Sequence, residues 1–200
     1  MSELSERALP DDLEEDPLFW CARARAYLKG ILPDSPSEEP LHLRKEDEPV
    51  LKDLKNGLAV LYLVDGGGMF YYIHNRHLRA TGWSIDQLHS RSVENLASFA
   101  GPKLRLQDVG GAFMVLVDGN FEASLLLVDK FWDRIAVPRV GPDIAAALPA
   151  RDVLTFCGAD SAEGIARMRQ GIAAVSSGGN HLLTDRLYRR VAGNWVPFEP

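Results

Sequence analysis

Residues 58–74, LAVLYLVDGGGMFYYIH, determine the expected fold class of this chain. Two runs of aliphatic and aromatic residues flank three consecutive glycines. Such runs around a glycine turn are typical of a β-hairpin, because strands favour these side chains and glycine tolerates the positive φ of a tight turn. The first run is apolar without interruption, as is AFMVLV at residues 112–117, so we expect both faces of these strands to be buried.

Similar pairs of short strands follow along the chain, and segments with helical periodicity separate them. The pairs begin near residues 58, 103, 143 and 186, and the amphipathic segments are at residues 84–100, 120–135 and 160–176. This order predicts an α+β fold with antiparallel sheets, because such short turns permit only antiparallel neighbours. We expect repeated β-β-α units, produced by duplication or by evenly spaced hairpins, in one sheet of roughly eight strands or in two smaller sheets.

Polar residues at the starts of the three amphipathic segments match the preferences of helix N-caps. The predicted caps are Ser84 with Gln87, Asn120, and Asp160 with Glu163. In the second segment, Trp132 shares an apolar stripe with Phe121, Leu125 and Val128, so we predict that its side chain is buried.

The N-terminal quarter differs from the rest of the chain in composition. Residues 1–10 are predicted to be disordered, residues 11–49 to form an N-terminal helix and a loose linker, and residues 50–200 to form a single α+β domain. The helix is expected at residues 11–32, and its aromatic side chains are too numerous for water. It is therefore expected to pack on the main body or on a neighbouring subunit. The sheet face left open by the other helices needs this helix, a second sheet or a partner chain.

Charge and hydropathy exclude several classes of protein. The formal net charge of −6 argues against binding to nucleic acid or to an anionic membrane, since both require a basic face. No apolar run approaches the roughly 20 residues of a membrane helix. The acidic N-terminus does not resemble a secretory signal. Cys21 and Cys157 lie in apolar surroundings and are predicted to be buried free thiols, so we expect a cytoplasmic protein.

Local motifs for catalysis or metal binding are weak. His74 and His77 are three residues apart, but no cysteine or carboxylate lies at ligand spacing, so we predict no metal site. The glycines at 66–68 precede neither a helix nor a Lys-Ser or Lys-Thr pair, so a hairpin turn explains them better than a phosphate loop. Neither cysteine has a neighbouring histidine, and no Gly-x-Ser-x-Gly motif is present. We expect no cofactor.

Three polar clusters lie at turns between elements whose apolar parts should pack together. They comprise Asp118 and Asn120 with Glu122 close by, Arg151 with Asp152, and His181 with Asp185 and Arg186. Neighbouring arginine and aspartate residues often hold loops in place through ion pairs and caps. We expect such a tether, in which Arg151 pairs with a carboxylate of another unit. The candidates are Asp118, Glu122 and Asp185. The alternative is a site for a ligand or a partner.

The same clusters carry a resemblance to a known family. The segments VDGNFEASLLLVDKFWDRI (117–135), AALPARDVLTFCGADSAEGIARMR (146–169) and HLLTDRLYRR (181–190), followed by GNW, resemble the pattern of the YtpQ-like family. These are bacterial proteins assigned to a domain of unknown function, and the resemblance extends over about residues 57–195. It implies a cytoplasmic bacterial protein, and it assigns no catalytic role to any residue.

Two functional hypotheses follow from these observations. The first is a non-enzymatic interaction or regulatory module with a protein partner or a second copy of the chain. It rests on the absence of a catalytic constellation and on strands that are apolar on both faces. The second is a small hydrolase or ligand-binding enzyme that uses the polar clusters. Convergence of Asp118, Glu122, Arg151, Asp152 and His181 in one pocket would favour the enzyme.

Overall fold

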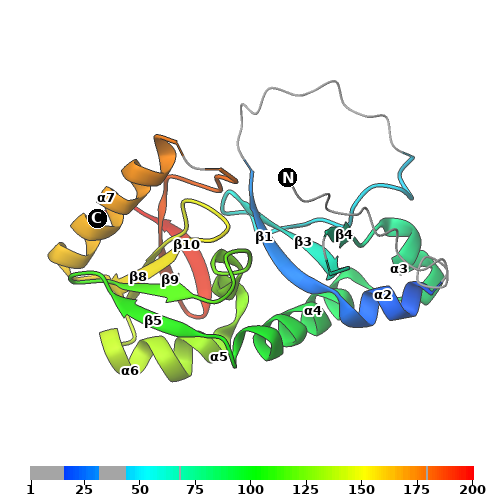
Figure 1. Ribbon diagram of the computed structural model, residues 1–200, viewed down its shortest axis with the longest axis horizontal. Helices are drawn as coiled ribbons and strands as arrows, with labels where there is room; N and C mark the ends of the chain where they lie inside the picture. Colours follow the sequence, from blue (N-terminus) through cyan, green and yellow to red (C-terminus); the bar gives the residue numbers. More distant parts are fainter. Residues whose placement is uncertain (1–15, 32–43, 68, 179) are drawn as a thin grey trace, which may run out of the picture.

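The computed structural model describes residues 16–31, 44–67, 69–178 and 180–200. The predictions for residues 1–15 and for the part of the linker at residues 32–43 lie outside the described residues. The chain adopts an α+β fold with two antiparallel sheets, which confirms the predicted fold class (Figure 1). No helix in the described part of the chain is long and apolar enough to cross a membrane.

The first sheet is built around β3 (Leu58–Asp65). β1 (Arg25–Gly30) pairs with one edge of β3, and β2 (Lys52–Asp53) and β4 (Phe70–Tyr72) pair with the other. The first seven residues of β3 are buried, as its uninterrupted apolar run predicts. Gly67 in the β3–β4 turn has φ +83°, which explains a glycine at that position.

The N-terminal helix is shorter than predicted. α2 spans Pro17–Arg23, and the Asp16 carboxylate accepts a hydrogen bond from the Phe19 amide at its start. The chain then enters β1, so the predicted helix is wrong at residues 25–30. Buried Ala26 and Leu28 alternate with more exposed neighbours, which is the period of a strand. Pairing of residues 25–30 with residues 58–63 of β3 makes this segment part of the sheet.

Two helices follow β4. α3 (Asn75–Thr81) follows directly and ends at Gly82 in the left-handed conformation. α4 (Ile85–Ala100) begins with the predicted capping box. The Ser84 amide donates to Gln87 Oε1 at 2.8 Å, and the Gln87 amide donates to Ser84 Oγ at 3.1 Å. α4 packs against β1.

The second sheet has six strands in the order β10-β9-β7-β8-β6-β5. Its strands are β5 (Arg105–Asp108), β6 (Phe113–Leu116), β7 (Ile144–Ala147), β8 (Leu154–Gly158), β9 (Leu187–Val191) and β10 (Asn194–Phe198). The last three strand pairs therefore lie at the positions that were predicted from the sequence. β6 is only partly buried, with Leu116 exposed, so the expectation that both its faces are buried is wrong.

α7 (Ala162–Ser176) covers part of one face of the second sheet by packing on β7 and β8. Its N-cap is Ser161, whose hydroxyl accepts a hydrogen bond from the Gly164 amide at 3.1 Å. The prediction that Asp160 caps this helix is therefore wrong. Both Cys21 and Cys157 are buried and free, as predicted.

The second predicted helix, at residues 120–135, is instead a series of short turns. These are the 3-10 helix η1 (Ala123–Leu127), α5 (Asp129–Phe131), the π-helix η2 (Trp132–Ala136) and α6 (Val137–Val140). Trp132 explains the interruption, because its indole N–H donates to the carbonyls of both Leu125 and Leu126 at 3.1 Å. Trp132 is completely buried, as predicted.

The repeated β-β-α pattern is not confirmed. The first strand pair belongs to a different sheet from the other three, α3 is inserted after it, and the second unit lacks a continuous helix. The two sheets nevertheless share one apolar core. Leu28 and Tyr62 of the first sheet and Phe156 and Tyr188 of the second belong to the same buried cluster.

Candidate functional site

The first predicted polar cluster stabilises the loop after β6. Glu122 is only 3% exposed, and its Oε1 accepts hydrogen bonds of 2.8 to 2.9 Å from the amides of Val117, Asp118 and Gly119. Asp118 Oδ1 accepts from the amides of Asn120 and Phe121. These bonds close a turn at residues 118–121. The helix that follows has Glu122 as its N-cap and no side-chain cap, so the prediction that Asn120 caps a helix is wrong. Both carboxylates are engaged by backbone amides of their own loop.

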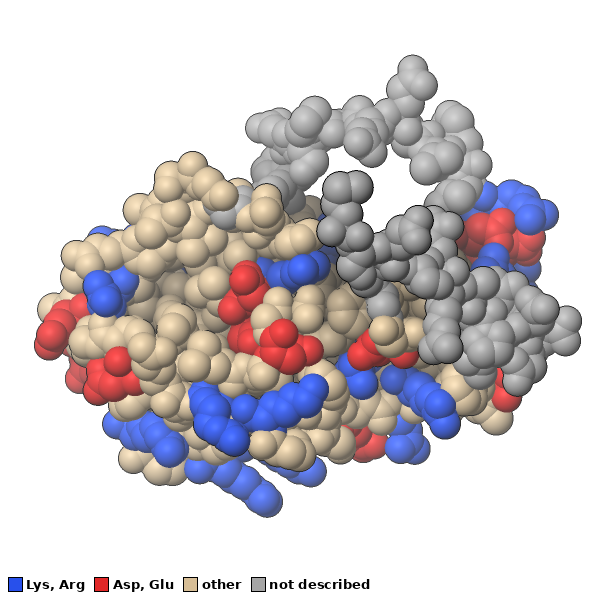
Figure 2. All heavy atoms as spheres, in the orientation of Figure 1, with Lys and Arg blue, Asp and Glu red and all other residues tan. Residues whose placement is uncertain are grey.

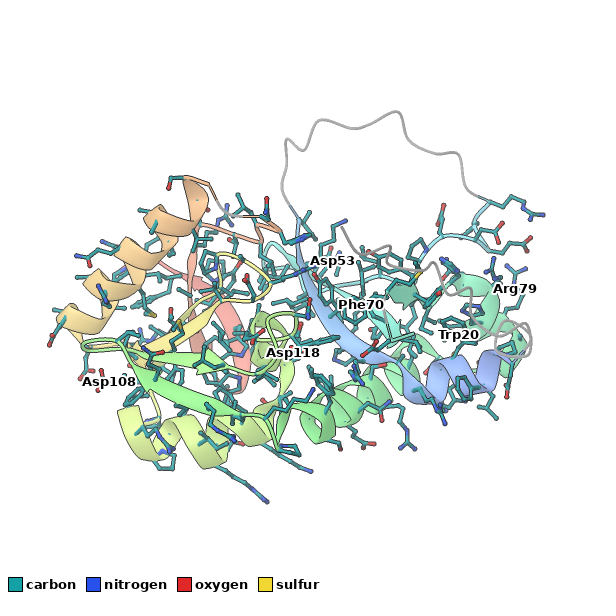
Figure 3. The ribbon with its side chains drawn as sticks, viewed as in Figure 1. Trp20, Asp53, Phe70, Arg79, Asp108 and Asp118 are labelled. Atoms are coloured by element: carbon teal, nitrogen blue, oxygen red, sulfur yellow. The ribbon has the colours of Figure 1, made fainter. Side chains whose placement is uncertain are left out.

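This loop connects the two sheets through Phe121. The Phe121 ring is buried and makes edge-to-face contacts with Tyr27 of β1, Phe70 of β4 and Phe99 of α4. Figure 3 shows Asp118 at the junction between the sheets, with Phe70 on the side of the first sheet. The polar residues of this cluster thus hold an aromatic contact in place.

Arg151 lies at the same junction and contacts neighbours mainly through its backbone. Its carbonyl accepts a hydrogen bond from the Ala123 amide at 3.1 Å, and its amide donates to the His181 carbonyl at 3.2 Å. Burial raises the pKa of the Tyr27 hydroxyl, and the nearby Arg151 guanidinium opposes the rise. Arg151 forms no ion pair with a carboxylate among the described residues, so the predicted pairing with Asp118, Glu122 or Asp185 is wrong.

The remaining predicted site residues, Asp152, His181, Asp185 and Arg186, are exposed. Near Arg186, the Tyr188 hydroxyl donates to the Asn56 carbonyl at 3.2 Å, and the Asn56 side chain donates to the Trp195 carbonyl at 2.9 Å. These contacts connect the β2–β3 turn to the second sheet. The predicted clusters therefore lie at the junction of the sheets and are connected mainly by backbone hydrogen bonds. These contacts have a structural role.

A different site is formed by α2, β1, β3 and α4. These elements enclose a cleft of about 620 Å³ whose lining includes Phe19, Arg23, Arg25 and Phe99. The Arg23 guanidinium lies 3.9 Å from the centroid of the Phe19 ring, and the Arg25 guanidinium lies 3.8 Å from that of Phe99. The Lys103 ammonium contacts the same Phe99 ring at 3.6 Å. Aromatic faces attract cations, so the rings hold these three groups in place.

The cleft carries more positive than negative charge. Its lining includes one carboxylate, that of Asp65, whose Oδ2 lies 3.4 Å from Arg25 Nη1. Within the described part of the chain, neither Arg23 nor Lys103 forms an ion pair. Sequence reasoning missed this site, because a helix through residue 32 does not place Arg25 on a strand beside α4.

Basic side chains continue beyond the cleft. Figure 2 shows Lys and Arg side chains gathered along the lower edge of the molecule, where β5, α5 and α6 lie in Figure 1. Asp129 and Asp133 of this region both bind Arg190 of β9, at 2.8 and 2.6 Å. Their exposed neighbours Lys130 and Arg134 form no ion pair among the described residues. This edge is therefore locally basic in an acidic protein.

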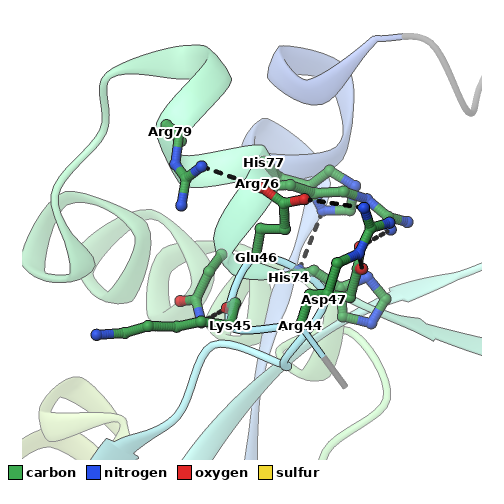
Figure 4. A network of polar contacts seen from close by, with 9 residues as sticks. Arg44, Lys45, Glu46, Asp47, His74, Arg76, His77 and Arg79 are labelled. Carbon is green, nitrogen blue, oxygen red and sulfur yellow. Dashed lines mark hydrogen bonds and ion pairs between the residues drawn. The ribbon is translucent and has the colours of Figure 1, made fainter. Parts of the chain in front are cut away.

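A network of ion pairs connects residues 44–48 to α3 (Figure 4). Arg76 binds Asp47 at 2.8 Å, and Arg79 binds Glu46 at 3.1 Å. In the same helix, the buried His77 ring stacks on Trp20, and its Nδ1 accepts a hydrogen bond from the His74 amide. The charges of this network are paired, which gives it a structural role. In the described ranges, no group of three or more His, Cys, Asp or Glu residues is placed to hold a metal ion.

Comparison of the chain with protein-family models, with curated proteins and with solved structures finds no match. The resemblance to the YtpQ-like family therefore stays a prediction. The geometry and charge of the cleft are the basis for assigning a function.

Proposed function

We propose that this protein is a non-enzymatic interaction module that binds an acidic protein segment in the cleft between α2, β1, β3 and α4. The observation that carries this proposal is the arrangement of Arg25 and Lys103 on the Phe99 ring, with Arg23 on Phe19 beside them. Cations ordered in advance by aromatic rings lose little conformational entropy on binding. Arginine also offers paired donors that match a carboxylate.

The size and charge of the site favour a short peptide segment over a nucleic acid. A cleft of about 620 Å³ accommodates a few side chains. The protein as a whole carries a net charge of −6, which repels a long polyanion more than a segment with a few carboxylates. The apolar walls formed by the two phenylalanine rings suit a segment in which aromatic or aliphatic residues alternate with acidic ones.

The contacts of the polar clusters support a binding module over an enzyme. Glu122 and Asp118 are two of the three carboxylates in the enzyme hypothesis, and both accept hydrogen bonds from backbone amides of their own loop. A carboxylate that is committed to several amides is poorly placed to act as a general base. The enzyme hypothesis therefore has less support than the interaction module.

The proposal is tested with a labelled peptide in which glutamate and phenylalanine alternate. Fluorescence anisotropy should show saturable binding that weakens as salt is added, because the attraction between exposed charges is screened. A peptide with glutamine in place of every glutamate is the control. It should bind about tenfold more weakly or worse.

Variants of the protein locate the binding. Arg23→Gln combined with Lys103→Gln should weaken binding of the acidic peptide by about tenfold while changing the stability by about 0.5 kcal/mol or less, since both side chains are exposed. Lys29→Gln, an exposed position on β1 outside the cleft lining, is the matched control and should bind normally. Failure of the wild type to bind the peptide, or unchanged affinity in the double variant, would contradict the proposal.

A further inference from the structure

An apolar groove lies on the second sheet, between α7 and the strands β6 and β8. It has a volume of about 510 Å³, and its lining includes Met114, Val153, Met168 and Val175. Figure 2 shows the surface hollowed between these elements, bordered mostly by residues that are neither acidic nor basic. The groove and the basic cleft share no lining residue, so what the groove binds is independent of the function proposed above.

Gly171 keeps one wall of the groove open. It belongs to the lining, and a Cβ atom placed on it would meet no other atom within 4 Å. A glycine in the middle of a helix is less favourable than alanine by roughly 1 kcal/mol. At this position the smaller residue leaves room above the sheet for an apolar group from outside the chain.

One charged side chain stands at the groove. Arg167 is the only acidic or basic residue among the described residues that line it. Its Nε donates a hydrogen bond to the Val109 carbonyl at 2.6 Å, which fixes the orientation of the guanidinium. Its Nη1 is 3.5 Å from Gln170 Oε1, which is a weak contact. The guanidinium therefore retains donors for an anion at the edge of an apolar groove.

We propose that this groove binds a small amphipathic molecule with an apolar body and a single carboxylate. The body lies against Met114, Met168 and Ile172, and the carboxylate accepts hydrogen bonds from Arg167. Charge complementarity selects this class of ligand, because the groove offers one cation and no carboxylate among its described residues. A groove of this volume lies within the usual range for small-molecule sites.

The probe is decanoate at concentrations where it is monomeric, with binding measured by titration calorimetry. We expect saturable binding of one decanoate per chain and a rise in melting temperature. Decanol has the same chain with a neutral head and should bind about tenfold more weakly, because it lacks the charge-assisted hydrogen bond. Acetate has the head without the body and should produce no heat of binding at the same concentration.

Three variants separate groove binding from other effects. Gly171→Leu fills the groove and should weaken decanoate binding by about 100-fold or more, while the melting temperature stays equal or rises. Ala173→Leu, an exposed position on the same helix outside the groove lining, should bind as the wild type does. Arg167→Gln should weaken decanoate binding by about tenfold and leave decanol binding unchanged.

Three outcomes would contradict this proposal. Absence of saturable decanoate binding to the wild type, or full binding by a folded Gly171→Leu variant, would show that the groove is not a binding site. Equal affinities for decanoate and decanol in the wild type would show that Arg167 does not select an anionic head, and would also overturn the proposed ligand class.

Discussion

The buried His77 makes the stability of this protein sensitive to mild acid. His77 is 7% exposed and stacks on Trp20, and burial together with the nearby positive charge of Arg76 lowers its pKa from 6.5 to about 4. In the unfolded chain the imidazole binds a proton below about pH 6.5. The folded protein holds it neutral until about pH 4, so the unfolded state binds more protons throughout this interval.

The free energy of unfolding should therefore fall as the pH is lowered from 6.5 to 4. His77 should account for about 3 kcal/mol of this decrease. Above pH 6.5 the contribution is complete. Urea denaturation at several values of pH between 7.5 and 4.5 measures it. Burial also lowers the pKa of His74 and His89, so they act in the same direction. The difference between the wild type and His77→Gln isolates the share of His77.

The glutamine in His77→Gln can still accept the hydrogen bond from the His74 amide, so the variant should fold. Its stability should decline less steeply between pH 6.5 and 4.5 than that of the wild type. His181→Asn is the control, because His181 is exposed and asparagine tolerates its positive φ of 55°. Parallel slopes for the wild type and His77→Gln would contradict this explanation.

Residues whose role depends on a repeating pattern could be predicted from the sequence, and those whose role depends on a loop conformation could not. Trp132 was correctly expected to be buried because it shares a stripe with other apolar residues. Glu122 was expected to pair with Arg151 or, in the alternative, to line a ligand site, yet it holds three amides of its own loop. That role depends on the path of residues 117–122, which no local periodicity determines.

At the level of single elements, the two glycines of α7 should respond to substitution in opposite directions. A Cβ atom on Gly164 would lie 2.4 Å from the Gly111 carbonyl oxygen and 2.6 Å from Cys157 Cβ. Gly171 has open space at the same place. Gly171→Ala should therefore raise the free energy of unfolding by about 0.5–1 kcal/mol, through helix propensity alone. Gly164→Ala should lower it by about 1–3 kcal/mol, because crowding outweighs the same gain.

Denaturant unfolding of the two variants beside the wild type measures both changes. Each variant controls for the other, since both replace the same residue type within one helix. Equal stabilisation of both variants would show that α7 does not pack closely on β8 and on the loop before β6. That result would also remove the structural basis for the apolar groove.

The N-terminal segment and the second predicted helix show why element type was harder to predict than element position. Residues 18–28 have apolar positions compatible with a helix, but pairing with residues 58–63 of β3 makes residues 25–30 a strand. At residues 123–140, the hydrogen bonds of Trp132 to two carbonyls fold the chain into short turns. Both outcomes follow from tertiary contacts that override local preference.

For the whole molecule, the sequence predicted the strand pairs and their antiparallel character, but not how they divide between two sheets. Neighbouring pairs look alike in the sequence, and the division follows from contacts between distant residues. The Leu28 amide, for example, donates to Ser124 Oγ at 2.9 Å across 96 positions. The cleft lies where α2 and β1 meet α4, so it could be recognised only after that division was known.

The shared core predicts that the two sheets unfold together. Trp20 and Trp83 lie beside the first sheet, whereas Trp132 of η2 packs on Phe156 of the second sheet and Trp195 lies in β10. Replacing either pair by phenylalanine leaves tryptophan fluorescence to report one sheet, while far-ultraviolet circular dichroism reports both. In each variant the two signals should give the same urea midpoint, because a single cooperative transition has one midpoint for every probe.

Asn56 provides the decisive change, because its side chain donates to the Trp195 carbonyl and so connects the sheets. Asn56→Ala removes this hydrogen bond and the acceptor for the Leu58 amide. It should lower the free energy of unfolding by about 1–3 kcal/mol. Introduced into both tryptophan variants, it should shift the fluorescence midpoints of the first and second sheets alike. A shift confined to one sheet, or separate midpoints without the substitution, would mean that the sheets are independent folding units and that the contacts at their junction do not couple them.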